Sequence, residues 1–211
     1  MNRKHFTILA ALAIFSMAAV SAQNATVESV CKSLTAHKVT TGNFTQEKKI
    51  ANAKRSLKSS GTFLFSSTLV IWDTEKPVAS SLIVTNDKII QKSPNGKTSV
   101  LSGSDNEAFK GVSQSVTALF SGDKSALERN FTINFSSTAT TWKMVLTPKD
   151  KTVASAMKTI TVSGTGNAKS SVFTNLAVEQ LDGGTINYAF TDHKYKEELS
   201  DAEKALIKTA K

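Results

Sequence analysis

Apolar and polar positions alternate along residues 39–91, where short apolar runs are separated by basic or serine-rich turns. Successive side chains of a strand point to opposite faces of a sheet, so this pattern predicts antiparallel strands with one dry face. Phe63 and Phe65 then share one face, and Leu64 lies on the other. Further strands are predicted at residues 131–135, 141–146, 158–163, 172–180 and 185–190. Hairpin turns are predicted at residues 94–96 and 182–184.

Helical spacing replaces this alternation in three places. Residues 24–38 carry one apolar stripe, with Thr26 as a cap, and this stripe should pack on the sheet. Residues 106–120 have the same period, and residues 200–203 form a capping-box pattern before a short helix to Ala210. Residues 125–129 and 148–151 are expected to be turns.

About ten strands with few helices predict a mainly β fold. We expect a strongly curved antiparallel sheet, an incomplete half-barrel, whose concave apolar face is covered by helices. Residues 23–211 contain no linker, repeat or composition shift, so a single domain is expected.

The first residues have the pattern of a cleaved signal peptide. Arg3 and Lys4 precede an apolar run, and small residues end it at Ala22, so residues 1–22 are predicted to be removed. Export of this kind predicts a periplasmic protein. The formal net charge is +9, and the basic residues are scattered. This favours a merely soluble surface, or a solvated rim near an anionic membrane or partner, over nucleic-acid binding.

Catalytic and metal-binding patterns are missing. Cys31 is the one cysteine, so no intramolecular disulfide can form, and it is expected to be a small buried apolar residue. His37 and His193 lack a second ligand at metal spacing and are expected at the surface. Asp73 and Glu75 are interpreted as turn residues. No enzyme activity and no cofactor are therefore expected.

Several motifs, in order along the chain, resemble the LolA family of periplasmic lipoprotein carriers. Trp72 and Pro77 have the spacing of the family's W-x-x-x-x-P segment. The other matching segments are Gly42-Asn43-Phe44-Thr45-Gln46, Leu57-Lys58-Ser59-Ser60-Gly61-Thr62-Phe63, Phe120-Ser121-Gly122-Asp123, Trp142-Lys143-Met144-Val145-Leu146-Thr147-Pro148-Lys149-Asp150-Lys151, Ile160 and the hairpin from Gly183-Gly184-Thr185-Ile186 to Phe190.

This resemblance implies a carrier that receives a lipoprotein from an inner-membrane ABC transporter and passes it to an outer-membrane acceptor. It implies an incomplete barrel whose helices form a lid over an apolar cavity. The family has an Arg-Pro pair shortly before its tryptophan, and the arginine helps to control release. Residues 65–72 contain neither arginine nor proline, so that role is assigned to no residue here.

Apolar residues of the predicted dry face are expected to bind the acyl chains, and the protein is expected to be a monomer. The predicted cavity wall is Phe63, Phe65, Ile71, Trp72, Leu82, Val84, Ile89, Trp142, Met144 and Leu146. The predicted lid face is Phe109, Val112, Leu119 and Phe120.

Three other interpretations remain open. The chain could carry or sense another lipid-like ligand. It could be an enzyme for an apolar substrate, which requires polar groups such as Glu47, Asp73 or His193 to converge inside the cavity. It could also be a structural protein with a filled core and no cavity.

Overall fold

A computed structural model describes residues 23–85, 88–102, 117 and 120–208. The predicted signal peptide and three lid residues, Phe109, Val112 and Leu119, lie outside this part of the chain. The described strands are β1 (Val39–Lys49), β2 (Leu57–Ser66), β3 (Leu69–Lys76), β4 (Ser80–Thr85), β5 (Lys88–Lys92), β6 (Thr98–Ser102), β7 (Phe131–Ser137), β8 (Thr141–Pro148), β9 (Met157–Gly166), β10 (Ser171–Gln180) and β11 (Thr185–Lys196). The described helices are α1 (Val27–Leu34), α3 (Lys124–Asn130), α4 (Lys151–Ala156) and α5 (Asp201–Lys208).

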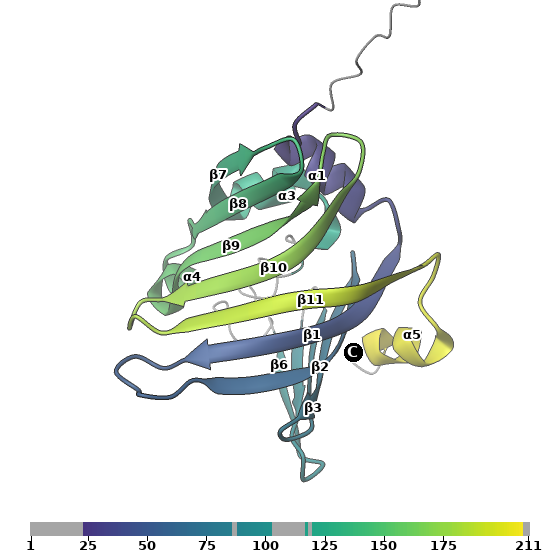
Figure 1. The fold of residues 1–211 in the computed structure, drawn as a ribbon. Helices are drawn as coiled ribbons and strands as arrows, with labels where there is room; N and C mark the ends of the chain where they lie inside the picture. The colour runs from purple at the N-terminus through teal and green to yellow at the C-terminus, as the bar shows by residue number, and fades with distance from the viewer. Residues whose placement is uncertain (1–22, 86–87, 103–116, 118–119, 209–211) are drawn as a thin grey trace, which may run out of the picture.

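All the described strands form one antiparallel sheet of 11 strands (Figure 1). Their order is β6-β5-β4-β3-β2-β1-β11-β10-β9-β8-β7, so the first strand lies in the centre and pairs with the last. Strands β6 and β7 stand at opposite ends of this order, and the sheet does not close into a barrel. The predicted fold class is therefore confirmed, with a longer β11 than the sequence pattern indicated.

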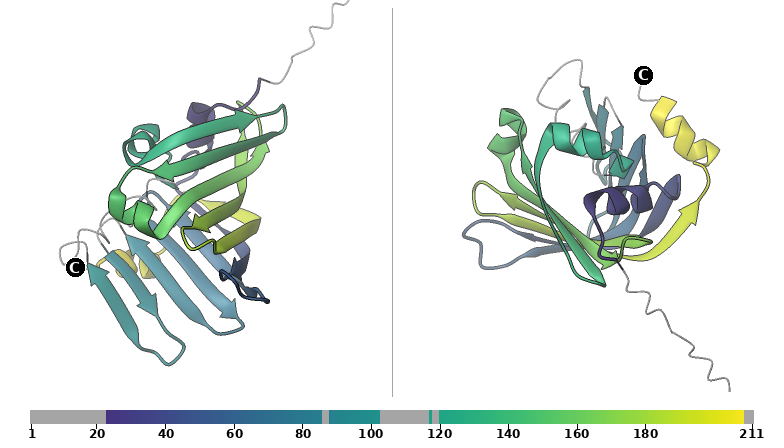
Figure 2. Two further views of the ribbon diagram at one scale, coloured as in Figure 1. Left: turned by 90° about the vertical axis from the view of Figure 1, so that its left-hand side faces the viewer. Right: turned by 90° about the horizontal axis from the view of Figure 1, so that it is seen from above.

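Side chains from distant strands meet because the sheet is strongly curved. Strands β2 and β10 are three places apart, which in a flat sheet corresponds to about 14 Å. Yet the ring centroids of Phe65 and Phe173 are only 5.4 Å apart. Figure 2 shows the resulting trough, with α1 and α3 on its inner side and α5 beside its outer side.

The first helix packs on the inner face as its stripe predicts. Val30 and Cys31 of α1 are buried, and Thr26 caps the helix by accepting from the Ser29 backbone N–H at 3.1 Å. Burial raises the pKa of the Cys31 thiol to about 11, so this cysteine is a protonated core residue, as expected. Lys124 of α3 joins the two helices through an ion pair with Glu28 at 2.7 Å.

Two separate apolar clusters lie on the two faces of the sheet. The inner cluster fills the concave side, and the outer cluster lies on the convex side of β1–β5, against Leu199 near α5. Buried members of the inner cluster are Ala25, Val30, Cys31, Phe44, Phe63, Phe65, Val70, Val84, Phe120, Leu127, Phe131, Trp142, Met144, Leu146, Ile160, Val162, Phe173, Leu176 and Phe190. Buried members of the outer cluster are Val39, Leu64, Leu69, Ile71, Ile83 and Ile90.

One short helix replaces a predicted turn, and another begins where the predicted turn at residues 148–151 ends. Residues 125–129 belong to α3, because the Asp123 side chain accepts from the Ala126 backbone N–H at 3.0 Å and starts a helix. Asp150 similarly accepts from the Val153 backbone N–H at 2.9 Å and begins α4. The predicted capping box of α5 is confirmed, with Ser200 and Glu203 exchanging hydrogen bonds.

Candidate functional site

Seven rings in mutual contact form an aromatic cluster at the centre of the concave face. The closest pair is Phe65 and Phe120, which stack with centroids 3.9 Å apart. Trp72 meets Phe65 edge-on at 5.2 Å, and Phe173 meets Phe190 edge-on at the same distance. The aromatic cluster is defined as Phe63, Phe65, Trp72, Phe120, Phe173, Tyr188 and Phe190.

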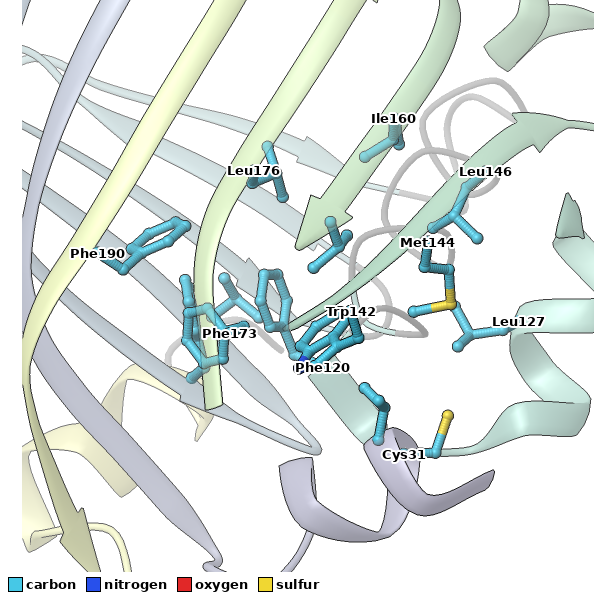
Figure 3. Close-up of a cluster of buried hydrophobic side chains, with 14 of the residues drawn as sticks. Cys31, Phe120, Leu127, Trp142, Met144, Leu146, Ile160, Phe173, Leu176 and Phe190 are labelled. Atoms are coloured by element: carbon cyan, nitrogen blue, oxygen red, sulfur yellow. The ribbon is translucent and has the colours of Figure 1, made fainter. Parts of the chain in front are cut away.

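The part of the trough formed by β8 and β9 has fewer aromatic side chains. Alternate residues of β8, Trp142, Met144 and Leu146, point inward, and Figure 3 shows them facing Cys31 of α1 and Leu127 of α3. Ile160 and Val162 of β9 lie in register beside them. These side chains are buried against helices, so the part of the trough formed by β8 and β9 is a packed core.

The structure brings nine of the ten predicted wall residues together in or against the inner cluster. Phe63, Phe65, Val84, Trp142, Met144 and Leu146 are buried there, and Trp72, Leu82 and Ile89 pack against it. The placement of Ile71 on this wall is wrong. Ile71 adjoins Trp72 in β3, so its side chain points to the opposite face and joins the outer cluster. Whether the nine residues contact a ligand stays a prediction.

Of the predicted lid residues, Phe120 is described. It is buried, stacks on Phe65 and meets Trp72 at 6.1 Å, so it covers the aromatic cluster from the side opposite the sheet.

Glycines opposite the large rings explain two of the sequence motifs. Gly42 is the register partner of Phe63, and a Cβ there would stand 2.7 Å from the phenyl Cε1. Gly164 faces Trp142 in the same way, at 2.7 Å from Cζ2. A Cβ at either position would collide with the ring and with a backbone carbonyl, so both positions require glycine.

Two adjacent cavities open at one end of the aromatic cluster, beside the end of α1. They have volumes of about 340 and 530 Å³ and share Leu34, His37, Thr40 and Phe173 as lining residues. The smaller cavity is also lined by Phe65 and Phe120 of the aromatic cluster. The concave face is thus accessible from this end.

Polar side chains surround the mouth of these cavities. Ser66, Ser67 and Thr68, from the stretch that lacks the family's arginine, line the smaller cavity. Its basic side chains are Lys38 and Lys204, and Lys204 is paired with Glu198 at 3.0 Å.

The expectation that His193 is a surface residue is wrong. Its ring packs edge-on against Phe63 at 5.6 Å and Phe173 at 5.0 Å, and burial lowers its pKa. The bulged residue Asp192, with φ of 53°, shifts the strand by one residue and turns His193 inward. His37 stacks on Tyr195 at 4.0 Å, and both histidines line the larger cavity.

Tyr188 connects the aromatic cluster to a polar chain. The Gln46 side-chain amide donates to the Tyr188 hydroxyl at 2.8 Å, and the Ser59 hydroxyl donates to Gln46. Burial raises the pKa of Tyr188 to about 12, so the phenol stays neutral. This chain accounts for the glutamine in the G-x-F-x-Q motif.

The polar groups of the enzyme interpretation do not converge. Glu47 lies beside Ser56 and Lys58, exposed Asp73 accepts from the Ser81 hydroxyl, and His193 alone lies inside. Within the described ranges, no group of three His, Cys, Asp or Glu side chains could hold a metal ion.

Sequence reasoning missed Phe173, Leu176, Tyr188 and Phe190 as wall residues. Tyr188 and Phe190 alternate with the small or polar residues 187, 189 and 191, so a strict period of two in β11 predicts them on one face. Phe173 and Leu176 are three apart, because a register shift between Phe173 and Asn175 breaks the alternation in β10.

Comparison with known proteins gives one family and a set of remote structural neighbours. The family model described as outer membrane lipoprotein carrier protein LolA matches residues 35–203. A DUF1329 family protein from Desulfovibrio piger has a TM-score of 0.50 at 10% identity, covering 83% of this chain and 93% of that one. A LolA superfamily protein from Nitrosomonas europaea has a TM-score of 0.46 at 11% identity, covering 83% and 94%.

A putative outer membrane lipoprotein-sorting protein domain from Vibrio parahaemolyticus has a TM-score of 0.46 at 10% identity, covering 86% of this chain and 97% of that one. No curated protein matches the chain significantly. Among the described helices, none is long and apolar enough to cross a membrane.

Proposed function

The chain belongs to the LolA family of outer membrane lipoprotein carrier proteins, and from this premise we propose that it carries lipoprotein acyl chains across the periplasm. The acyl chains bind against the concave face, and the protein moves them from the inner to the outer membrane. Residues 1–22 direct export and are removed. The donor is an inner-membrane ABC transporter, and the acceptor lies in the outer membrane.

The observation that carries this proposal is the aromatic cluster beside an open cavity. Phe65, Phe120 and Phe173 form a deep apolar surface, and the same three residues line the 340 Å³ cavity. Each methylene removed from water contributes about 0.8 kcal/mol, so an acyl chain of about fifteen carbons needs on the order of 10 kcal/mol of shielding. A curved sheet with an accessible apolar interior supplies such shielding without covalent chemistry.

The test uses the mature chain, residues 23–211, and a synthetic triacylated peptide. Native mass spectrometry should find acyl ligand on the purified protein, and the triacylated peptide should raise the Tm. The same peptide without acyl chains is the matched control and should leave the Tm unchanged. Empty protein together with no Tm shift from any acyl ligand would refute the proposal.

The cargo is identified by competition. A triacylated peptide should displace a fluorescent fatty acid more effectively than a diacyl phospholipid of equal chain length does. Preference for the phospholipid would make the protein a carrier or sensor of another lipid. Chemical cleavage of the bound ligand, seen by mass spectrometry, would instead make it an enzyme.

A further inference from the structure

We propose that Trp72 recognises the ester or amide group of the bound acyl chain by donating its indole Nε1–H to the carbonyl oxygen. This inference rests on the proposed function and specifies its ligand: an acyl compound rather than a plain hydrocarbon. Trp72 would then determine specificity as well as supply apolar area.

The position of Trp72 suits this role. Its ring contacts Phe65 at 5.2 Å and Phe120 at 6.1 Å, and both phenylalanines line the 340 Å³ cavity. One phenylalanine ring therefore separates the indole from the cavity. An acyl chain whose tail occupies this cavity and lies along Phe65 would place its carbonyl end at the indole.

The indole nitrogen lacks a partner although it is buried. Among the described residues, the buried side-chain polar atoms without a hydrogen-bond partner are Trp72 Nε1 and His193 Nε2. Leaving a buried donor unpaired is unfavourable, so a hydrogen bond from this atom to a bound ligand would be stabilising. Trp142 has no such need, because its Nε1 donates to the Thr165 carbonyl at 3.2 Å.

One unpaired atom belongs to Trp72 of the aromatic cluster, and the other belongs to His193, which packs against that cluster. Trp72 contacts Phe65, and His193 contacts Phe63 and Phe173. A hydrocarbon could satisfy neither atom. The Trp72 indole is a donor only, so it requires an acceptor, and a carbonyl is the acceptor that every acyl linkage carries.

The wild-type protein tests this directly, because it has two tryptophans, and the indole N–H of Trp72 is unpaired whereas that of Trp142 is hydrogen-bonded. Protein labelled with nitrogen-15 at tryptophan is titrated with methyl dodecanoate and with tetradecane of similar length, each delivered from cyclodextrin. The ester should move the Trp72 indole N–H signal downfield, as a new hydrogen bond does. Tetradecane should not, and the Trp142 signal should move downfield with neither ligand.

Substitution gives a second measurement. Trp72→Phe should weaken binding of methyl dodecanoate roughly threefold to tenfold more than it weakens binding of tetradecane, because both ligands lose the same ring area and the ester alone also loses a hydrogen bond. Trp142→Phe is the matched control, and it should not change the preference for the ester. Equal losses for both ligands in Trp72→Phe would mean that the ring contributes area alone, which would overturn the inference.

The outcomes separate this inference from the proposed function. If both ligands shift phenylalanine signals of the aromatic cluster but affect the Trp72 indole equally, the inference fails and the carrier proposal stands. If neither ligand perturbs any signal of the aromatic cluster, the carrier proposal fails, and this inference fails with it.

Discussion

The two faces of strands β2–β5 are both buried, but they differ in chemistry. The outer cluster is aliphatic, with Leu64, Ile71, Ile83 and Ile90 in one register row. The inner face places Phe63, Trp72 and Leu82 in the matching row, beside the rest of the aromatic cluster and two unpaired polar atoms. Burial alone therefore does not locate a binding surface, whereas aromatic density and unsatisfied polar groups distinguish the inner face from the outer one.

The largest change in stability should come from a substitution in the outer cluster. Leu69 is fully buried there, so Leu69→Ala should lower the free energy of unfolding by about 2–5 kcal/mol. Acyl-ligand affinity, measured well below the Tm, should not change, because the side chain points away from the cavity. Urea denaturation and a binding titration check the two parts. A loss of ligand affinity in Leu69→Ala would contradict the assignment of ligand binding to the inner face alone.

A smaller effect is expected on the inner face, and it should appear in binding. Phe65→Leu keeps an apolar side chain but removes the ring that stacks on Phe120, so affinity for a triacylated peptide should fall roughly tenfold. Ile83→Val, on the outer face, is the matched control and should bind normally. Normal binding by Phe65→Leu would mean that the ligand binds somewhere other than the aromatic cluster.

His193 should make stability depend on pH. Burial lowers its pKa below the ordinary 6.5, so below that pH the unfolded chain binds a proton more readily than the folded chain. The free energy of unfolding should therefore fall as the pH falls, by less than about 1.4 kcal/mol per pH unit. Above about pH 7.5 the effect should vanish, since both states are neutral.

Comparing the wild type with His193→Gln by urea denaturation at about pH 8 and about pH 5 isolates this contribution. The variant should lose less stability on acidification than the wild type. Identical pH dependence would mean that the imidazole is hydrated in the folded protein.

The smallest change in stability is expected at the edge of the outer cluster, in β6. Val100 of β6 is the register partner of Ile90, yet it is 53% exposed. Val100→Thr should therefore change the free energy of unfolding by no more than about 0.5 kcal/mol, whereas Ile90→Thr should be clearly destabilising. Thermal melts of the two variants check this, and equal effects would extend the outer cluster to the edge strand.

The sequence predicts the curved antiparallel sheet well, because alternation and hairpin turns are local signals. Phe63, Phe65 and Met144 were placed on the correct face by period alone. Ile71 was not, since adjacent Ile71 and Trp72 are both apolar and only one can point inward. A strand buried on both faces gives no alternation to read.

Contacts that depend on bulges and distant strands could not be predicted. His193 turns inward because of the bulge at Asp192, and Phe173 reaches Phe65 only because the sheet curves. The short helices α3 and α4 also escaped prediction, because each begins at a single aspartate cap that is equally common in turns.

The central claim is that the acyl chain lies on the concave face, and intermolecular nuclear Overhauser contacts test it most directly. Wild-type protein bound to a triacylated peptide should show contacts from the acyl methylenes to the rings of Phe65 and Phe173. The δ1 methyls of Ile83 and Ile90, on the outer face, should show none. Contacts to these isoleucines, with none to the two rings, would contradict the account.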